Sequence, residues 1–296
     1  ANSQNHRGPL SFDFMAITDF LSPLLGAGFY YKTFMWPKAF WEKFYEPAIR
    51  KSAGLGTLST EADPDTYDKG FRHCDILIIG SGATGLSAAL TAAESGAKII
   101  LADEDFLMGG RLNSETNEID GIAGSEWAKK TVAKLGAMEN VTLMSDTTVF
   151  GAYDHGIYGA IENRVSEARE DNDKPRQVNW RIYTKRAILC AGATERLIAF
   201  GNNDRPGIML ASAVRTYLNR FAVATGQRIS VYTNNDDGWK TAKDLNAKGF
   251  RVAALIDSRS ISPVMRVPGA EIFMGTDVVD TKGRRALKSI QLSNGK

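Results

Sequence analysis

The stretch that decides the fold is Asp75-Ile-Leu-Ile-Ile-Gly-Ser-Gly-Ala-Thr-Gly-Leu-Ser-Ala-Ala-Leu90, closed by Ile99-Ile-Leu-Ala-Asp-Glu104. A short apolar run enters a GxGxxG turn, an alanine-rich helix follows, and a second apolar strand ends on acid. Gly80 permits the tight turn, Gly82 lets the backbone approach a pyrophosphate, and Gly85 lets helix and strand pack closely. The helix N-terminus offers unpaired N–H groups to phosphates. The pattern predicts a dinucleotide-binding βαβ unit.

Two further features extend this site. Asp103 lies 18 residues after Gly85, close to the ~20 expected for an acceptor of the ribose hydroxyls. An acidic pair at Asp103 and Glu104 disfavours a 2′-phosphate, so we expect NAD or FAD rather than NADP. The glycine doublet in Met108-Gly-Gly-Arg-Leu112 is a place where the backbone can lie against the cofactor.

Composition excludes several classes of partner. A chain of 296 residues should hold about two domains with a substantial core, and 43% apolar with 24% charged residues is ordinary for a globular protein. The 36 basic and 34 acidic residues give +2 without a basic stripe, which argues against nucleic acid. No apolar run reaches the ~18 residues of a membrane span.

The cysteines and histidines point to neither redox nor metal chemistry. Cys74 and Cys190 lie at or inside expected buried strands, without a CxxC partner, and we interpret both as core residues. Two cysteines and no secretory segment favour a reducing cytoplasm. His6, His73 and His155 are scattered, so we expect no metal site.

Residues 1–71 are expected to form an aromatic-rich arm and a linker. Nine aromatics fall within seventeen positions: Phe29, Tyr30, Tyr31, Phe34, Trp36, Phe40, Trp41, Phe44 and Tyr45. This is too dense for one face of an amphipathic helix, so the segment is either buried on several sides or lies at a partner surface. Ser52 to Gly70 is typical of a linker.

Residues 72–205 are expected to form the dinucleotide-binding domain with a β-meander. Ser125 to Leu135 predicts a helix, and Val141 to Met144 and Thr147 to Phe150 predict strands. The meander follows over 151–187, with Val178 to Tyr183 as a strand after a polar turn at Glu170 to Pro175. Ala187-Ile-Leu-Cys-Ala-Gly-Ala193 predicts another strand that runs into a turn of small residues.

Residues 206–296 contain a second βαβ pattern: a strand at Arg228 to Thr233, a helix near Trp239 to Lys248, and a strand at Arg251 to Asp257. Its turn, however, is Thr-Asn-Asn-Asp-Asp-Gly238. Asp236 and Asp237 would face a pyrophosphate, and like charges at close range cost more than the helix dipole returns. We therefore expect a degenerate βαβ domain that kept the fold and lost the dinucleotide.

Three segments resemble the alpha subunits of heterotetrameric sarcosine oxidases: Phe29-Tyr-Tyr-Lys-Thr-Phe-Met-Trp-Pro37, Trp41-Glu-Lys-Phe-Tyr-Glu-Pro47 and Asn202-Asn-Asp-Arg-Pro-Gly-Ile-Met-Leu-Ala-Ser212. The similarity runs from about Phe12 to the C-terminal end and is far more specific than GxGxxG. The order of motifs is also similar to two-domain disulfide reductase-like flavoproteins. The fold class we expect is α/β, with one FAD/NAD-binding βαβ domain and one degenerate copy.

The resemblance implies a larger assembly. The family's alpha subunit is about three times longer, so we expect a piece of a longer polypeptide that lacks an N-terminal domain and a C-terminal folate-binding domain. Family members oxidise sarcosine to glycine with hydrogen peroxide and methylene-tetrahydrofolate as products. A beta subunit carries FAD and covalent FMN, gamma and delta subunits complete the heterotetramer, and sarcosine and tetrahydrofolate bind elsewhere in the complex. The first βαβ unit of the family holds a tightly bound NAD.

Residue by residue, the resemblance assigns a cofactor site but no catalytic residue. The pyrophosphate loop matches Gly80, Ser81, Gly82, Ala83, Thr84 and Gly85; the ribose acceptor matches Asp103 or Glu104; the doublet matches Gly109, Gly110 and Arg111; the segment beside the adenine matches Thr148 and Val149; and the Ala-Gly turn matches Ala191 and Gly192. Two alternatives stay open. One is an FAD-using subunit of a related amine, proline or opine dehydrogenase, and the other is a non-catalytic scaffold subunit.

Overall fold

The computed structural model describes residues 8–9, 12–24, 26, 28–29, 34, 36–54, 58–165, 174–261, 265–283 and 286–295. The chain divides into two compact units, Ala1–Pro64 and Asp65–Lys296. The candidate site lies entirely in the second unit.

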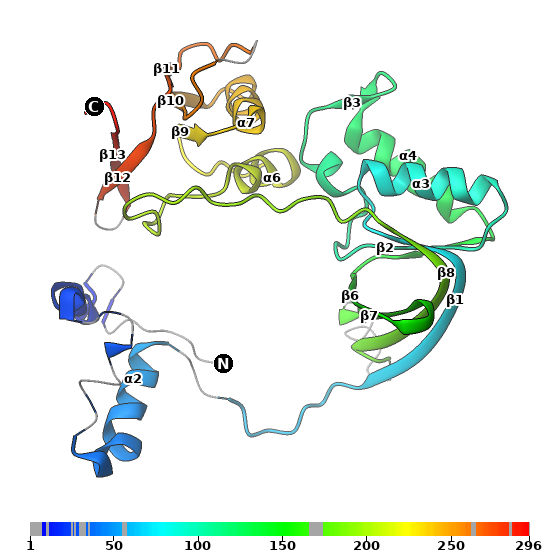
Figure 1. The fold of residues 1–296 in the computed structure, drawn as a ribbon, viewed down its shortest axis with the longest axis horizontal. Helices are drawn as coiled ribbons and strands as arrows, with labels where there is room; N and C mark the ends of the chain where they lie inside the picture. Colours follow the sequence, from blue (N-terminus) through cyan, green and yellow to red (C-terminus); the bar gives the residue numbers. More distant parts are fainter. Residues whose placement is uncertain are drawn as a thin grey trace. The chain divides into compact units, whose positions relative to one another are not determined.

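The first unit consists of short helical turns. They are the 3-10 helix η1 (Phe14–Leu24), the 3-10 turn η2 (Lys38–Phe40), the π-helical turn η3 (Trp41–Tyr45) and the helix α2 (Glu46–Ser52), drawn in blue in Figure 1. Trp36, Phe40 and Phe44 stay exposed, Trp36 to 84%. The part of the aromatic run at Tyr30 and Tyr31 lies outside the described residues. Core packing does not account for these three exposed side chains.

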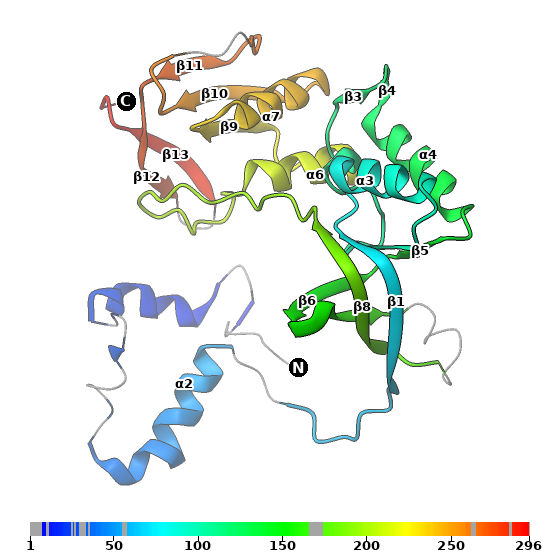
Figure 2. The same ribbon diagram turned by 45° about the vertical axis from the view of Figure 1, so that its right-hand side comes forward.

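The second unit begins with a mixed six-stranded sheet in the order β5-β2-β1-β8-β7-β6. Its strands are β1 (Tyr67–Ile79), β2 (Ile99–Ala102), β5 (Val141–Met144), β6 (Thr147–Tyr153), β7 (Ile157–Asn163) and β8 (Gln177–Leu189). Strand β1 pairs parallel to β2 and β8, and β2 pairs parallel to β5, whereas β6, β7 and β8 form the antiparallel meander. Figure 2 shows β1 and β8 running from the helix-covered part into the meander.

Helices α3 (Ala83–Glu94) and α4 (Gly124–Gly136) pack on one face of this sheet. Ile78 belongs to the core under these helices, whereas its neighbour Leu77 belongs to a core that includes Ile182 of β8. Both side chains are fully buried. Successive residues of a strand point to opposite faces, and a strand covered on both faces therefore needs a continuous apolar run. This explains why Ile76 to Ile79 is apolar without alternation.

Two expected boundaries were wrong. The expected linker, Ser52 to Gly70, includes the last residue of α2 and the first four residues of β1, because Tyr67 to Gly70 pair with the start of β8. The two strands expected around Val178–Tyr183 and Ala187–Ala193 are one strand, β8, which ends at Leu189. Lys185 and Arg186, which lie between the two expected strands, are exposed residues of β8, and Lys185 forms an ion pair with Asp75 of β1 at 2.7 Å. The expected turn at Glu170 to Pro175 falls mostly outside the described residues.

The second βαβ pattern is confirmed as a three-stranded parallel sheet in the order β11-β10-β9. It contains β9 (Arg228–Thr233), α7 (Asp236–Ala247), β10 (Arg251–Asp257) and β11 (Glu271–Met274), with α6 (Ala211–Phe221) packed beside α7. A hairpin of β12 (Val278–Gly283) and β13 (Leu287–Leu292) follows β11. Helix α7 starts three residues earlier than expected because Asn235 caps it. The smaller elements are the turn η4 (Gly110–Asn113), the hairpin β3 (Glu118–Ile119) with β4 (Ile122–Ala123), and the turn η5 (Asp154–Gly156).

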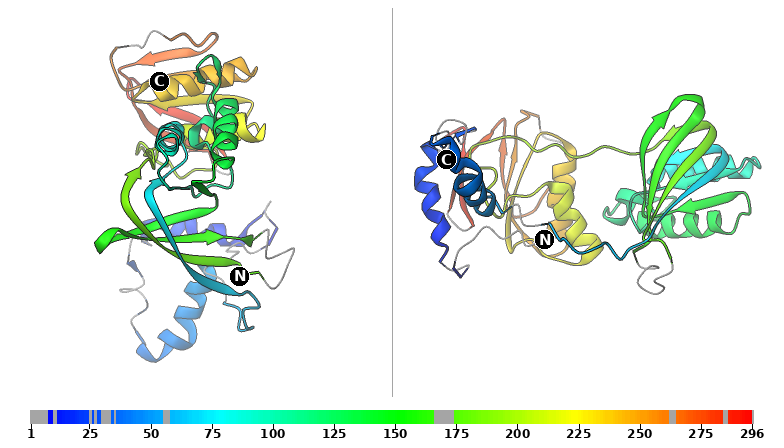
Figure 3. Two further views of the ribbon diagram at one scale, coloured as in Figure 1. Left: turned by 90° about the vertical axis from the view of Figure 1, so that its right-hand side faces the viewer. Right: turned by 90° about the horizontal axis from the view of Figure 1, so that it is seen from below.

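A long irregular connection joins β8 to α6 (Figure 3). Its Asn202-Asn-Asp-Arg-Pro-Gly segment is tied to the β12–β13 hairpin. The Asn202 amide donates to Asp280 Oδ1 at 2.7 Å, Thr281 Oγ1 donates to the Asn202 carbonyl at 2.9 Å, and the Arg205 guanidinium donates to the Gly283 carbonyl. This motif therefore has a structural role in the second domain. Among the described residues, no helix is both long and apolar enough to cross a membrane.

Candidate dinucleotide site

The glycine turn between β1 and α3 is sterically fixed at two positions. Gly80 has φ +99°, a conformation that L side chains rarely adopt, and a Cβ at Gly85 would lie 1.8 Å from the Gly80 carbonyl oxygen. A side chain at either position would have to displace backbone. These two glycines thus serve the turn and the close contact of helix with strand.

Gly82, by contrast, faces open space. It is the N-cap of α3 with φ −64°, and apart from its chain neighbours no described atom lies within 4 Å of the place a Cβ would take. No side chain caps the helix, and its first turn contains no acidic residue. The exposed N–H groups and the positive end of the helix dipole fit a bound pyrophosphate.

Ser81 connects this turn to the other parts of the site. Its side chain is fully buried, and both its backbone N–H and its hydroxyl donate to Asp103 Oδ2 at 2.6 Å. The same hydroxyl oxygen accepts from the Gly109 N–H at 3.0 Å. A Cβ on Gly110 would come within 3.0 Å of the Gly82 Cα. The turn, the acid at the end of β2 and the glycine doublet therefore lie together.

Asp103 keeps some capacity to accept a hydrogen bond. Its Oδ2 accepts twice from Ser81, and its Oδ1 accepts from the Asp105 N–H at 2.9 Å. An ionised carboxylate offers about four acceptor positions, so one position remains on Oδ1 for a ribose hydroxyl. Glu104 is exposed at the surface next to it.

The remaining expected site residues lie on two neighbouring segments. The Cys190 N–H donates to the Ile79 carbonyl at 2.7 Å, which places Ala191 and Gly192 directly beside the glycine turn. The Thr147 N–H donates to the Asp103 carbonyl at 2.8 Å, so Thr148 and Val149, which follow Thr147 in β6, lie close to the acid. Thr148 is exposed, whereas Val149 packs against the core of the sheet.

Arg111, however, points to a different partner from the one expected. Its guanidinium forms an ion pair with Asp237, at the start of α7, and a second one with Glu115 at 2.6 Å. Burial alone would lower the pKa of Arg111, but these carboxylates outweigh it and raise it. The side chain is thus engaged by the second βαβ domain, and only its backbone stays with the doublet.

The polar groups of the second βαβ turn already have hydrogen-bond and ion-pair partners within the protein. The Asn235 side chain accepts from the Asp237 N–H at 2.9 Å, and Asp236 forms an ion pair with Arg259 at 2.9 Å. At the end of β10, Asp257 is fully buried and accepts from Trp239 Nε1 at 2.7 Å. The residues that would meet phosphate and ribose are therefore occupied by the protein.

Sequence reasoning missed the polar contacts between the two domains. Arg215 of α6 is buried and donates from Nε to Asp244 Oδ2 at 3.0 Å, while Asp244 Oδ1 accepts from Thr116 Oγ1 at 2.8 Å. Arg220 pairs with both oxygens of Asp105, at 2.5 and 2.8 Å. These contacts join residues 29 to 128 positions apart, so no local sequence pattern indicates them.

The two cysteines of this part of the chain are not activated. Burial raises the pKa of both Cys74 and Cys190, which keeps the thiols neutral and unreactive at physiological pH. Among the described residues there is no group of three or more His, Cys, Asp or Glu side chains that could hold a metal ion.

The comparisons with known proteins agree with this geometry. The model of the family "FAD dependent oxidoreductase" matches residues 75–281. The chain is 48% identical over 296 residues to the sarcosine oxidase subunit alpha of Rhizobium meliloti, covering all of this chain and 30% of that protein. It is 40% identical over 240 residues to the subunit alpha of Corynebacterium sp. strain P-1, covering 79% of this chain and 25% of that one. The resemblance expected from the sequence is confirmed, and the chain spans less than a third of these relatives.

Solved structures share the fold. An L-proline dehydrogenase from P. horikoshii aligns with a TM-score of 0.58 at 20% identity, over 80% of this chain and 41% of that one. A Lactococcus lactis thioredoxin reductase aligns with a TM-score of 0.56 at 20% identity, over 75% and 73% of the two chains. They confirm the two-domain α/β fold class that the order of motifs predicts.

Proposed function

The chain belongs to the FAD-dependent oxidoreductase family, and from this premise we propose that it is the dinucleotide-holding region of a sarcosine oxidase alpha subunit. One observation carries the proposal: the open, acid-free start of α3 beside Gly82 occurs in a chain 48% identical over its full length to such a subunit. The first βαβ unit would hold the nucleotide, and the second would hold none.

Each part of the site would bind a different part of the nucleotide. The N–H groups of Ala83 to Gly85 face the pyrophosphate at the start of α3, and the remaining position on Asp103 accepts from the ribose. The doublet Gly109 and Gly110 lets the backbone lie against the nucleotide. Thr148 and Val149 border the adenine, and Ala191 and Gly192 close the side next to the turn.

We propose NAD as the occupant, with FAD as the alternative. Both share the adenosine diphosphate half, to which every contact named above belongs, so the glycine turn does not discriminate between them. The preference for NAD comes from the family resemblance. The acidic pair Asp103 and Glu104 disfavours the 2′-phosphate of NADP.

The oxidation chemistry would take place elsewhere in a larger complex. Near the site, burial raises the pKa of the Cys190 thiol, and hydrogen bonds from Arg220 lower the pKa of Asp105, so neither shift activates a nucleophile or a general base. A cytoplasmic assembly with beta, gamma and delta subunits would oxidise sarcosine on the beta subunit. FAD and FMN would be held there, and tetrahydrofolate would bind to another part of the alpha polypeptide.

The test is to identify the bound nucleotide. The full protein is purified, denatured, and the released small molecules are identified by mass. NAD in about equal amount to the chain supports the proposal. Recovery of FAD alone, with a flavin spectrum that isolated alpha polypeptide retains, favours an FAD-using dehydrogenase subunit, and no nucleotide after saturation with NAD overturns the proposal.

A further inference from the structure

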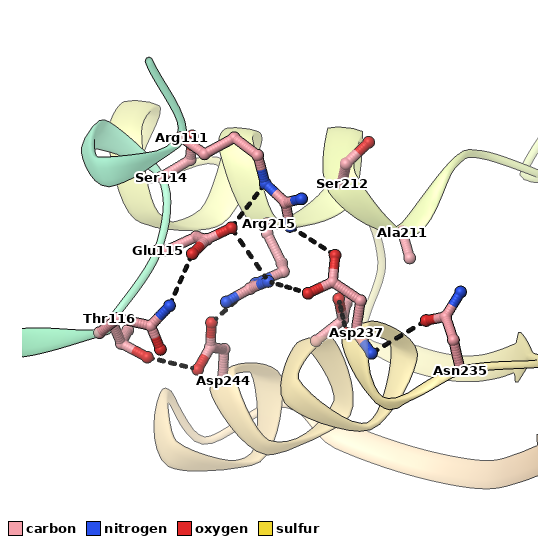
Figure 4. A network of polar contacts seen from close by, with 12 residues as sticks. Arg111, Ser114, Glu115, Thr116, Ala211, Ser212, Arg215, Asn235, Asp237 and Asp244 are labelled. Atoms are coloured by element: carbon pink, nitrogen blue, oxygen red, sulfur yellow. Dashed lines mark hydrogen bonds and ion pairs between the residues drawn. The ribbon is translucent and has the colours of Figure 1, made fainter. Parts of the chain in front are cut away.

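The carboxylate of Asp237 makes contacts that the functions proposed for the two βαβ units do not account for. Asp237 lies in the second βαβ unit, where its charge disfavours a phosphate. Its carboxylate, however, contacts residues outside that βαβ unit. Figure 4 shows Arg111 and Arg215 converging on it from two other elements. The Arg111 guanidinium pairs with Asp237 Oδ2, and Arg215 Nη1 lies 3.5 Å from Asp237 Oδ1.

The contact bears directly on the glycine doublet of the first unit. Arg111 follows Gly109 and Gly110 in the chain, and Gly109 is held on its other side by the buried hydroxyl of Ser81. The doublet is thus held between the glycine turn of the first βαβ unit and the start of α7 in the second βαβ unit. A two-residue segment with a contact at each end has little freedom to move away from a ligand.

Further polar contacts surround the Arg111–Asp237 ion pair. Arg215 is 3% exposed in its side chain and donates to Asp244, which in turn accepts from Thr116. Glu115 pairs with Arg111 at 2.6 Å and lies 3.9 Å from Arg215. Two arginines are therefore surrounded by three carboxylates. Arg215 and Asp244 are buried and need partners of opposite charge, whereas the side chains of Arg111 and Asp237 are 55% and 41% exposed.

We propose that Asp237 is a positioning residue for the nucleotide site of the first βαβ unit, acting through Arg111 to hold Gly109 and Gly110 against the glycine turn. The acid that removed phosphate binding from the second unit thereby serves the first. This inference rests on the proposed function for its effect on nucleotide, but not for the contact with the doublet.

The test compares two neighbouring acids in the full-length protein. Asp237→Asn removes the charge that holds Arg111, whereas Asp236→Asn removes an equal charge one residue earlier that pairs with Arg259 instead. NAD affinity is measured by calorimetry, with FAD titrated in parallel. We expect Asp237→Asn to weaken binding about threefold, the size expected for the loss of a half-exposed ion pair, and Asp236→Asn to bind as the unaltered protein does.

A second readout does not depend on nucleotide. The Gly109 amide is hydrogen-bonded to Ser81. In nucleotide-free protein its hydrogen exchange should become about threefold faster in Asp237→Asn and in Arg111→Gln, and no faster in the double variant than in either single variant, because both changes break one contact. Asp237→Glu should restore most of the protection. A general loss of stability would instead raise exchange throughout α6 and α7.

The outcomes separate the two proposals. If the unaltered protein binds neither NAD nor FAD, the proposed function fails, while the exchange comparison still decides whether Asp237 holds the doublet. Unchanged exchange and affinity in Asp237→Asn, or equal effects of Asp236→Asn, would overturn the positioning role.

Discussion

The two βαβ units of residues 65–296 share one strand–helix–strand arrangement, but the turns before their helices differ in capping and charge. Both keep the third glycine, Gly85 and Gly238, at the point where the helix packs on its strand. The first unit leaves the start of its helix open at Gly82, whereas the second caps its helix with Asn235 and two acids. The comparison teaches that the fold requires only the packing glycine and apolar strands, while the ligand requires an open, uncharged first turn.

The acids at the end of the second strand of each βαβ unit, Asp103 and Asp257, also differ in exposure and in hydrogen-bond partners. Asp103 is partly exposed and bonded mainly by Ser81, with one acceptor position left. Asp257 is fully buried between Trp239 and Arg259. One carboxylate is placed to meet a ligand, and the other has become part of the core.

The largest expected effect comes from the packing glycines. Gly85→Ala should lower the free energy of unfolding by about 3 kcal/mol, the upper end for overpacking, because the added Cβ meets the Gly80 carbonyl. Gly238→Ala should cost less, about 2 kcal/mol, because its Cβ would lie 2.4 Å from both the Cβ and the Oγ1 of Thr233. Rotation about χ1 moves the hydroxyl but not the Cβ, so β9 and α7 would have to shift apart slightly. Urea unfolding measures both.

A matched control for these two is Gly136→Ala in α4. Its Cβ would lie at an ordinary 3.6 Å from Leu143, so the higher helix propensity of alanine should stabilise the protein by about 0.5–1 kcal/mol. Equal losses at Gly85 and Gly238 would show that the two helix–strand contacts are equally rigid.

The second effect is on binding. Thr84→Asp gives the first turn an acid at the position that Asp237 holds in the second. A carboxylate about 4 Å from the pyrophosphate should weaken NAD binding about 100-fold or more, while the helix itself gains about 0.5 kcal/mol from the dipole. Thr84→Asn is the neutral control. Calorimetry and thermal unfolding measure the two quantities, and tight NAD binding by Thr84→Asp would contradict the comparison.

The third prediction concerns pH. Burial raises the pKa of Asp257, but hydrogen bonds from Arg259 and Trp239 outweigh it and bring the pKa below its usual 3.8. A lowered pKa adds stability above the unfolded value, and this stability is lost as the pH falls through the lower folded value. Asp257→Asn should therefore cost about 2 kcal/mol at pH 7, and the difference should shrink below about pH 4.

Urea unfolding between pH 3 and 7 checks this. Asp103→Asn serves as the comparison, and it should cost less stability because Asp103 is partly exposed. A pH-independent gap between the unaltered protein and Asp257→Asn would mean that the carboxylate's charge contributes nothing.

The smallest effects come from the two N-caps. Asn235→Ala removes the side chain that caps α7 and should cost about 1 kcal/mol. Gly82→Ala should leave thermal stability nearly unchanged, because φ is −64° and the Cβ position is open, yet it should weaken NAD binding. A large loss of stability in Gly82→Ala would show that the turn is not open.

Much of the fold could be predicted from the sequence, because its signals are local. The apolar run before Gly80, the spacing to Asp103 and the failed repeat at Thr233 to Gly238 depend on neighbours in the chain. The strand Val141–Met144 was expected with the bounds it has. The errors, at Tyr67–Gly70 and within β8, lie where pairing between distant strands overrides a polar or glycine-containing stretch.

The sequence by itself determined a first βαβ unit with an open glycine turn and a second whose turn contains two acids, and it predicts a dinucleotide in the first alone, since glycine geometry and like-charge repulsion act within a few residues. Only the tertiary structure decided what the second unit's acids do instead. Arg111, Arg215 and Asp237 come from three separate elements, and no sequence spacing relates them. Their contact exists because burying the arginine of α6 requires carboxylates around it, and folding supplies these from both domains.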